Sequence, residues 1–310
     1  MIAKYLLTKQ MNKKSIAIIG GNSFLGQSIF QYFPKDIFDC SIYSRYQSEG
    51  IQWNLFDYPA NYDFNCLLSY DTIIFCIAAG NQNTANNSFA NIIDVNCSLP
   101  LQLMHFLHQN NYSGKFFSFG SYFEIGINDT STYFTEDEVI NSNYQAANSY
   151  SLSKRLLSKA IASAFFNINY YHFILPTIFG KGEPGQRLIP YLISCIRAET
   201  SAQLTSGMQF RQYLFVKDLA NILELFINQP HSPGIYNVAG NKDAVQIIDL
   251  VKLLYKKANQ IFEPKSLSEQ RYDAGMQFLA IDNTKFNMAT NNNVVFTALE
   301  DALEDYYENN

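Results

Sequence analysis

Hydrophobic positions along this chain follow two alternating patterns. Short runs of β-branched and aromatic residues, at 15–19 and 38–44, are separated by a segment, 24–33, in which apolar residues recur at helical spacing. A continuous apolar run of about five residues is typical of a strand buried on both faces of a parallel sheet. The same reasoning predicts further strands at 72–77 and 115–119, and further helices at 94–109 and 146–165.

This alternation predicts an α/β fold, a Rossmann-type doubly wound parallel sheet over residues 15–175. The pattern becomes less regular after residue 175, where Pro and Gly residues mark a loop-rich passage. Helices are predicted at 188–196, 247–257 and 298–307, and segments 213–216 and 235–238 are predicted to return strands to the sheet. We therefore expect a smaller mixed substrate lobe over 176–310, interleaved with the sheet, whose last strands lie within about 211–240. Residues 1–14 are interpreted as an N-terminal extension.

Composition narrows the class of partner. Hydrophobic residues make up 47% of the 310 positions and charged residues 16%, which is enough apolar material for a large core. The net charge is −5 and no long basic run occurs. Nucleic acid and membrane surfaces are therefore not expected partners. The expected partner is a small molecule or a second copy of the chain.

Cysteine and histidine usage indicates a reducing compartment and no metal. The five cysteines are scattered and never in C-x-x-C spacing, and His105 and His108 have no acidic or thiol ligand nearby at metal spacing. The longest apolar runs are less than half the roughly 20 residues that a membrane-spanning helix needs. The first 14 residues do not form a convincing signal peptide. We expect a cytoplasmic protein.

A glycine-rich turn joins the first predicted strand to the first predicted helix. It contains Gly20, Asn22, Ser23, Phe24, Leu25 and Gly26. Such a turn lets backbone N–H groups and the helix N-terminus approach a pyrophosphate, so this segment is a candidate dinucleotide site. Ser23 stands where the middle glycine of the pattern is expected.

Cofactor choice is expected to depend on the end of the second strand. Ser44 and Arg45 lie there, where an acidic residue would bind a free ribose 2′-hydroxyl. An arginine instead suits a 2′-phosphate, which favours NADP(H) and leaves NAD(H) possible. The alternative is that Arg45 is a solvent-exposed surface residue.

Three Tyr-x-x-x-Lys pairs occur in the chain, beginning at Tyr5, Tyr150 and Tyr213. Only Tyr150 and Lys154 fall on a predicted helix, where side chains four residues apart are neighbours. They also follow the strand at 115–119 and the serine at position 121. A tyrosine is a poor acid–base group at neutral pH, and an adjacent ammonium favours its ionised form. We predict that Ser121, Tyr150 and Lys154 are catalytic.

From residue 15 onward, the chain resembles the extended short-chain dehydrogenases/reductases of the NAD-dependent epimerase/dehydratase group, which modify nucleotide sugars. The similarity is carried by the glycine turn, the segment 117–126, the Tyr150/Lys154 helix and the element from Arg211 to Asp218. It implies that the adenine and nicotinamide sides of the cofactor site include Asn54, Leu55, Ala78, Ala79, Gly80, Asn96 and Pro176. It implies a substrate side of Ser121, Tyr122, Thr177, Arg187, Arg211 and Arg271, with Ser118 as the nearest alternative to Ser121 for the catalytic hydroxyl. Asn54 and Thr177 depart from the residues usual in the group.

The resemblance leaves three functions open. The first is NADP(H)-dependent reduction of the 4-keto group of a 4-keto-6-deoxy nucleotide-diphosphate sugar, for surface-polysaccharide biosynthesis. The sequence of residues 121–126 resembles that of reductases of the abequose-synthase type. The second is a 4-epimerase with tightly bound NAD, and the third is a dinucleotide-binding homologue without turnover. A dehydratase usually has an acidic pair directly after the catalytic hydroxyl, whereas Tyr122 and Phe123 follow Ser121 here, with Glu124 near. The resemblance also implies a homodimer, formed through helices 94–109 and 146–165.

Overall fold

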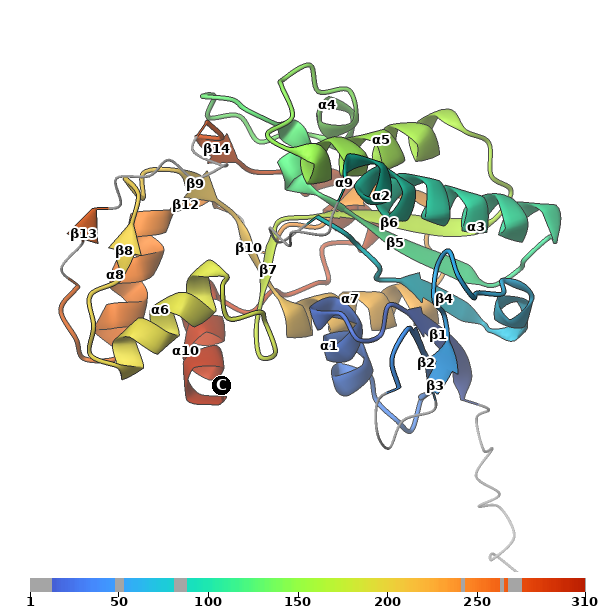
Figure 1. Cartoon of the computed structure of the whole chain (residues 1–310), viewed down its shortest axis with the longest axis horizontal. Helices are drawn as coiled ribbons and strands as arrows, with labels where there is room; N and C mark the ends of the chain where they lie inside the picture. The colour runs from blue at the N-terminus through green and yellow to red at the C-terminus, as the bar shows by residue number, and fades with distance from the viewer. Residues whose placement is uncertain are drawn as a thin grey trace, which may run out of the picture.

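A seven-stranded parallel sheet forms the centre of the molecule, which is described here from a computed structural model (Figure 1). The structure describes residues 13–47, 53–80, 88–240, 243–262, 265–266 and 275–309. The strand order is β11-β6-β5-β4-β1-β2-β3. The strands are β1 (Lys14–Ile19), β2 (Phe38–Ser44), β3 (Trp53–Leu55), β4 (Thr72–Phe75), β5 (Lys115–Ser121), β6 (Asn169–Leu175) and β11 (Gly234–Asn237). The direction of winding reverses between β1 and β4, and ligands of such sheets bind at the carboxyl ends of the strands beside this point.

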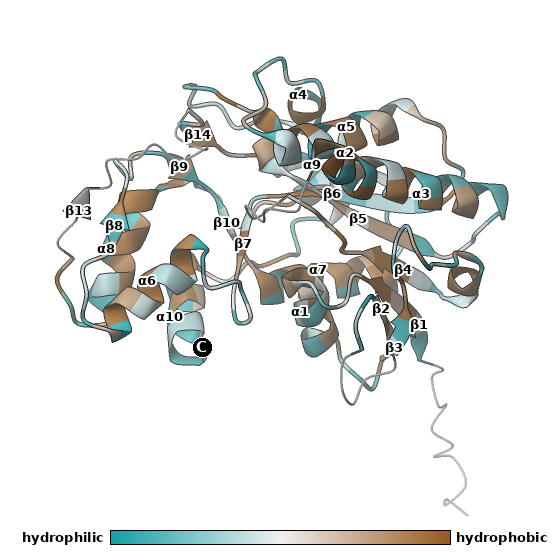
Figure 2. Cartoon of the chain, in the orientation of Figure 1, coloured by the Kyte–Doolittle hydropathy of each residue, from teal (hydrophilic) through white to brown (hydrophobic). Residues whose placement is uncertain are grey.

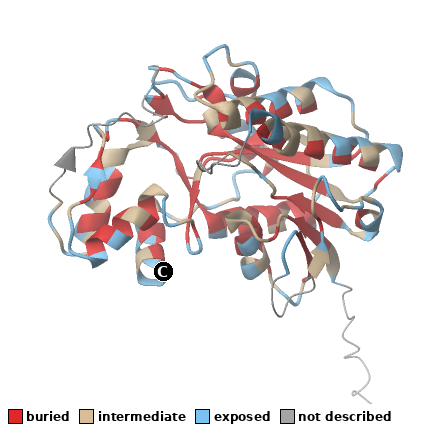
Figure 3. Cartoon of the chain, in the orientation of Figure 1, coloured by how far each residue is buried: buried red, intermediate tan, exposed pale blue. Residues whose placement is uncertain are grey.

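Helices cover both faces of the sheet, and the sheet itself is largely buried (Figure 3). They are α1 (Phe24–Tyr32) and α7 (Val216–Asn228) on one face, and α2 (Phe89–Ile93), α3 (Leu99–Gln109) and α5 (Ser149–Ser163) on the other. Along β1, Ile16 and Ile18 belong to the core beneath α1 and α7, while Ala17 and Ile19 belong to the core beneath α3 and α5. Alternate residues of one strand therefore contribute to two cores, which explains why β1 is apolar from Ile16 to Ile19. Figure 2 shows the hydropathy of the sheet and of the helices that cover it.

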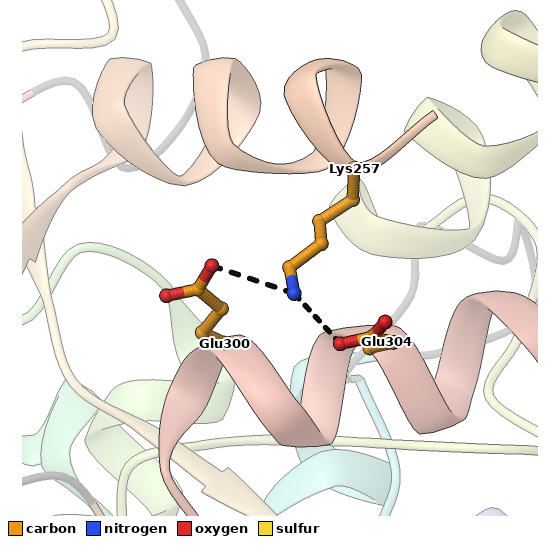
Figure 4. A network of polar contacts seen from close by, with 3 residues as sticks. All are labelled: Lys257, Glu300 and Glu304. Atoms are coloured by element: carbon orange, nitrogen blue, oxygen red, sulfur yellow. Dashed lines mark hydrogen bonds and ion pairs between the residues drawn. The ribbon is translucent and has the colours of Figure 1, made fainter. Parts of the chain in front are cut away.

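A smaller lobe with its own core lies beside the sheet (Figure 1). Its helices are α6 (Leu188–Arg197), α8 (Ile247–Lys257) and α10 (Leu299–Asn309). Its short strands are β7 (Thr177–Phe179), β8 (Gln203–Leu204), β9 (Phe210–Arg211), β10 (Tyr213–Phe215), β12 (Val245–Gln246), β13 (Lys265–Ser266) and β14 (Phe278–Leu279). β9 pairs antiparallel with β12 and parallel with β14, so this lobe is mixed. On its surface, Lys257 of α8 bridges Glu300 and Glu304 of α10 at 3.4 and 2.6 Å (Figure 4).

The fold class is confirmed: a Rossmann-type sheet is accompanied by a smaller mixed lobe. The helix expected at 247–257 is α8 with the same bounds. The helix expected at 94–109 begins as a π-helical turn, η2 (Asp94–Ser98), before α3. The remaining elements are η1 (Asn65–Ser69), η3 (Tyr122–Ile125), α4 (Glu136–Ile140) and α9 (Thr284–Ala289). Among the described residues, no helix has the length and apolarity to cross a membrane.

One strand prediction is wrong. Segment 213–216 does not join the main sheet, because β10 pairs with β7 alone among the described strands, and α7 begins at Val216. A run of three or four apolar residues identifies a buried strand but not its partner. Of the two segments expected to complete the sheet, only the second does so, as β11 beside β6.

Candidate active site

Two glycines shape the turn between β1 and α1. Gly20 has a φ of +85°, and a Cβ on it would lie 2.8 Å from Ile77 Cγ1. A Cβ on Gly26 would lie 2.5 Å from the carbonyl oxygen of Gly20, so α1 can start this close to β1 only with glycine there. Ser23, in the middle position, caps α1: its hydroxyl accepts a hydrogen bond from Gly26 N–H at 3.1 Å. The turn and helix N-terminus therefore form a cradle suited to a pyrophosphate.

At the rim of this cradle, two side chains bind the backbone carbonyl of Tyr46. Asn22 Nδ2 and Ser44 Oγ both donate to the Tyr46 carbonyl, at 2.8 and 2.7 Å. Ser44 is buried and also accepts from Trp53 Nε1 at 3.0 Å, so its hydroxyl orders this loop. Arg45 is exposed, with its guanidinium carbon 5.7 Å from the centre of the Tyr46 ring.

Asn54 and Leu55, the residues expected on the adenine side, are both described. Leu55 is 43% exposed, as a residue that covers a ligand must be. Nδ2 of Asn54 is buried and has no hydrogen-bond partner among the described residues. An amide left unpaired at this depth fits a site completed by a polar ligand.

Asn96 acts through the end of β4. It has no exposed surface, its Oδ1 accepts from Ala79 N–H at 2.7 Å, and its Nδ2 donates to the Ala79 carbonyl at 2.8 Å and to Ser153 Oγ at 2.9 Å. Asn96 thus joins Ala79, within the segment 78–80, to Ser153 on α5, and its direct contact with the cofactor stays a prediction. The π-helical turn that contains Asn96 is of a kind often found at functional sites.

The predicted acid–base pair lies on one face of α5, which Asn148 caps by accepting from Ser151 N–H at 2.9 Å. Lys154 Nζ is 6.0 Å from the centre of the Tyr150 ring and donates to the Phe119 carbonyl at 2.8 Å. This bond places the ammonium against the end of β5, two residues before Ser121. Burial lowers the pKa of Lys154 to about 8. Tyr213 lies in β10 while Lys217 lies in α7, so that pair does not share a helix face.

Ser121 is the last residue of β5 and the N-cap of η3. Ser118, the other serine of this strand, is 1% exposed and its hydroxyl is hydrogen-bonded to His172 Nδ1 at 2.8 Å. The geometry therefore favours Ser121 as the hydroxyl that could serve Tyr150.

The residues expected on the substrate side, and Pro176 from the cofactor side, differ in burial and in contacts. Tyr122 has no exposed surface and its hydroxyl lies 2.6 Å from Thr177 Oγ1, so Tyr122 supports Thr177, and its direct contact with substrate stays a prediction. Arg211 is 3% exposed and donates through Nη1 to the carbonyls of Phe210 and Met276, both at 2.8 Å. Pro176 is buried between β6 and β7. Arg271 lies outside the described residues.

Arg187 links the two lobes. Its guanidinium carbon lies 5.9 Å from the centre of the Phe24 ring in the glycine turn, and its Nε pairs with Glu183 Oε1 at 3.1 Å. Glu183 is almost fully buried, and burial raises its pKa to about 7. Sequence reasoning missed Glu183; its spacing of four residues before Arg187 was the available signal.

No group of three or more His, Cys, Asp or Glu side chains within the described ranges is arranged to hold a metal ion, and the five cysteines are free thiols. The site thus combines a phosphate cradle with a tyrosine and a buried lysine at the carboxyl edge of a parallel sheet. These are the parts of a dinucleotide-dependent enzyme that moves a proton beside its cofactor.

The family model of the NAD dependent epimerase/dehydratase family matches residues 16–239, and the chain belongs to this family. It is 21% identical to a CDP-abequose synthase of Yersinia pseudotuberculosis, over 66% of this chain and 70% of the relative. It is 27% identical to a CDP-abequose synthase of Salmonella typhimurium strain LT2, over 48% and 46% of the two chains. A UDP-glucuronic acid 4-epimerase of Bacillus cereus, solved with UDP-glucuronic acid and NAD, has a similar fold: the TM-score is 0.77 at 16% identity, covering 95% and 98% of the two chains.

Proposed function

We propose that the protein reduces the 4-keto group of a 4-keto-6-deoxy nucleotide-diphosphate sugar with NADP(H), in the cytoplasm, for surface-polysaccharide biosynthesis. The observation that carries this proposal is the set of groups around Ser121. Tyr150 beside Lys154 can deliver one proton, whereas Tyr122 is buried and Glu124 has no exposed surface to offer a substrate. A dehydration would need further acid–base groups. The two CDP-abequose synthases among its relatives support the same reaction type.

The residues of the site divide the work of the reduction. When bound, the nicotinamide supplies a hydride. Tyr150 protonates the C4 oxygen of the sugar, and the ammonium of Lys154 favours the ionised form of that tyrosine, which makes it a better acid–base group near neutral pH. Ser121 donates a hydrogen bond to the same oxygen as negative charge develops there. Gly20, Gly26 and the N-terminus of α1 hold the pyrophosphate of the cofactor.

On the substrate side, Arg187 and Arg211 are assigned to the diphosphate, with Arg271 as a third candidate. A diphosphate needs fixed cationic donors, and the guanidinium group matches its geometry. The contacts of Arg187 with Glu183 and of Arg211 with two carbonyls restrain both side chains before any ligand binds. Restraint of this kind reduces the entropy lost on binding.

The test is incubation of the purified protein with NADPH and a panel of 4-keto-6-deoxy sugars linked to CDP, GDP, dTDP or UDP, following NADPH absorbance. Consumption of NADPH with one of them is the expected result. No consumption with any of them, while NADPH still binds, would contradict the proposal.

A 4-epimerase is the second candidate, because the fold is shared with an epimerase solved with NAD. An epimerase returns the hydride and so retains its cofactor. Tightly bound NAD in the purified protein, together with interconversion of nucleotide sugars without added NADPH, would favour this function over the reductase.

A further inference from the structure

A fully buried acidic side chain, Glu124, lies behind the acid–base pair and takes no part in the proposed mechanism. Its Oε1 accepts a hydrogen bond from Ser121 N–H at 2.7 Å, while the Ser121 hydroxyl accepts from Phe123 N–H at 3.3 Å. These reciprocal bonds form a capping box at the start of η3. The backbone at Ser121 is therefore fixed by Glu124.

The carboxylate of Glu124 lies close to β5, the strand that Lys154 also contacts. A Cβ on Gly120 would lie 2.6 Å from Glu124 Oε1, so glycine is needed there to admit the acid. The next residue back, Phe119, accepts the hydrogen bond from Lys154 Nζ at 2.8 Å. Glu124 and Lys154 thus lie against adjacent residues of β5, one from η3 and the other from α5.

Other titratable groups lie near this pair. On α5, Arg155 binds the carbonyls of Glu124 and Ile125 at 2.6 and 3.0 Å, which fixes its charge at the outer side of η3. Cys76, directly after β4, and Cys97, in η2, influence Lys154, but burial raises the pKa of both thiols, so they stay neutral near pH 7.

On β6, His172 lies between two serines. Ser118 Oγ is 2.8 Å from its Nδ1 and Ser158 Oγ is 2.9 Å from its Nε2. Burial lowers the pKa of His172 to about 3, so the ring is neutral over the working pH range. The carboxylate of Glu124 is therefore the anionic group that opposes the buried charge of Lys154.

We propose that Glu124 is a positioning residue that serves both partners of Tyr150: it holds Ser121 by a hydrogen bond and keeps Lys154 protonated by its negative charge. The catalytic part of this inference rests on the proposed function. The electrostatic part does not, because it concerns two side chains of the same chain.

The sign of the effect follows from the surroundings. Burial lowers the pKa of Lys154 to about 8, and the charge of Glu124 opposes that fall. Burial also raises the pKa of Glu124 to about 7, while the charges of Lys154 and Arg155 lower it. The ionised form of Glu124 therefore favours the charged form of Lys154, and the charge of Lys154 favours the ionised form of Glu124. Removing the acid must lower the pKa of Lys154 further.

The decisive variant is Glu124→Gln, because the amide can still accept from Ser121 N–H but carries no charge. The matched control is Glu138→Gln: Glu138 closes a second capping box, with Thr135 on α4, on the exposed surface. The protein is labelled with 13C-lysine, and the Cε signal of Lys154, assigned with Lys154→Arg, is followed against pH. We expect its midpoint to fall by about one pH unit in Glu124→Gln, within the range for loss of a close opposite charge. It should not move in Glu138→Gln.

The second measurement is the pH profile of turnover. The alkaline limb should shift downward by the same amount in Glu124→Gln, with kcat reduced at pH 8 and KM for the sugar little changed. An unchanged Lys154 midpoint would overturn the proposal, and so would a shifted midpoint with an unchanged alkaline limb. A shifted midpoint in a protein whose wild type turns over no nucleotide sugar would refute the proposed function and leave the Glu124–Lys154 pairing intact.

If Glu124→Gln does not fold, the reciprocal variant tests the same coupling. Coupling between two titrating groups is mutual, so Lys154→Met must raise the pKa of the Glu124 carboxyl, read from its 13C signal. An unchanged carboxyl pKa would overturn the pairing.

Discussion

Tyr150 owes its expected reactivity to its neighbour on the next turn of α5. Replacing it with Phe removes the proton donor but keeps the ring, so the dinucleotide should still bind. General acid catalysis typically contributes about 10²- to 10⁴-fold, and Tyr150→Phe should lose about that much in kcat. Turnover of the reactive sugar and dinucleotide binding by fluorescence would be measured on the same preparation.

Tyr213→Phe is the control for this prediction, because Tyr213 and Lys217 have the same spacing but lie on β10 and α7. It should keep near wild-type turnover. Wild-type turnover in Tyr150→Phe, or an inactive Tyr213→Phe, would show that the wrong tyrosine has been assigned.

Arg45 is the residue that we expect to make the protein prefer NADP(H) to NAD(H). Its exposed guanidinium lies beyond the end of β2, where a 2′-phosphate could be bound by charge-assisted hydrogen bonds worth about 1.5–3 kcal/mol. Arg45→Asp should therefore weaken NADPH binding by about tenfold or more, and should spare or improve NADH binding. Dissociation constants of both cofactors would be measured for both proteins. Tighter binding of NADH than NADPH by the wild type would reject the preference and revive the epimerase.

At the scale of single residues, the sequence could predict which side chains lie near the site, but not how deeply each is buried or what it contacts. Tyr150 and Lys154 follow from one helical turn, and the structure places them as expected. Asn96 and Tyr122 were expected to touch ligands, yet both are fully buried and hydrogen-bonded to other protein groups. Burial depends on distant segments, such as the one bearing Thr177, which no local pattern reveals. Glu124 was detectable, since Ser-x-x-Glu is the spacing of a capping box.

At the scale of elements, the junction of β1 and α1 depends on Gly26. A Cβ at position 26 would lie only 2.5 Å from the carbonyl oxygen of Gly20, so the helix can start this close to the strand only because Gly26 has no side chain. Gly26→Ala should force this junction apart, at a cost of about 1–3 kcal/mol for overpacking. Dinucleotide affinity should then fall by about ten- to hundredfold. Titration calorimetry with NADPH and NADH would measure the loss.

Gly185→Ala is the matched control, because a Cβ there meets nothing within 4 Å. It should leave dinucleotide affinity unchanged. Equal losses in the two variants would show that the effect of Gly26→Ala is not specific to the junction.

Elements with a strong period were the most predictable. The apolar positions of α8 identify a helix with the bounds found, and β2 was placed equally well. The apolar residues Leu219, Ile222, Leu223 and Phe226 have helical spacing and lie on α7, a helix that was not predicted; only the strand before it was predicted. That run is β10, whose partner β7 lies more than thirty residues earlier in the chain. Pairing over such a distance is decided by the packing of the whole lobe.

At the scale of the whole molecule, we expect a homodimer that forms through the outer face of α5. Leu156 on this helix is 43% exposed, and Phe89 at the start of the neighbouring α2 is 58% exposed. An isologous contact of two copies would bury both, with Ala160 allowing close approach of the helices. We expect a homodimer at micromolar concentration and a monomer for Leu156→Glu, because two buried carboxylates would meet near the twofold axis. Light scattering with size-exclusion chromatography gives both masses, and Lys217→Glu, at an exposed position of α7, should remain dimeric. A monomeric wild type would refute the dimer, and a dimeric Leu156→Glu would place the interface elsewhere.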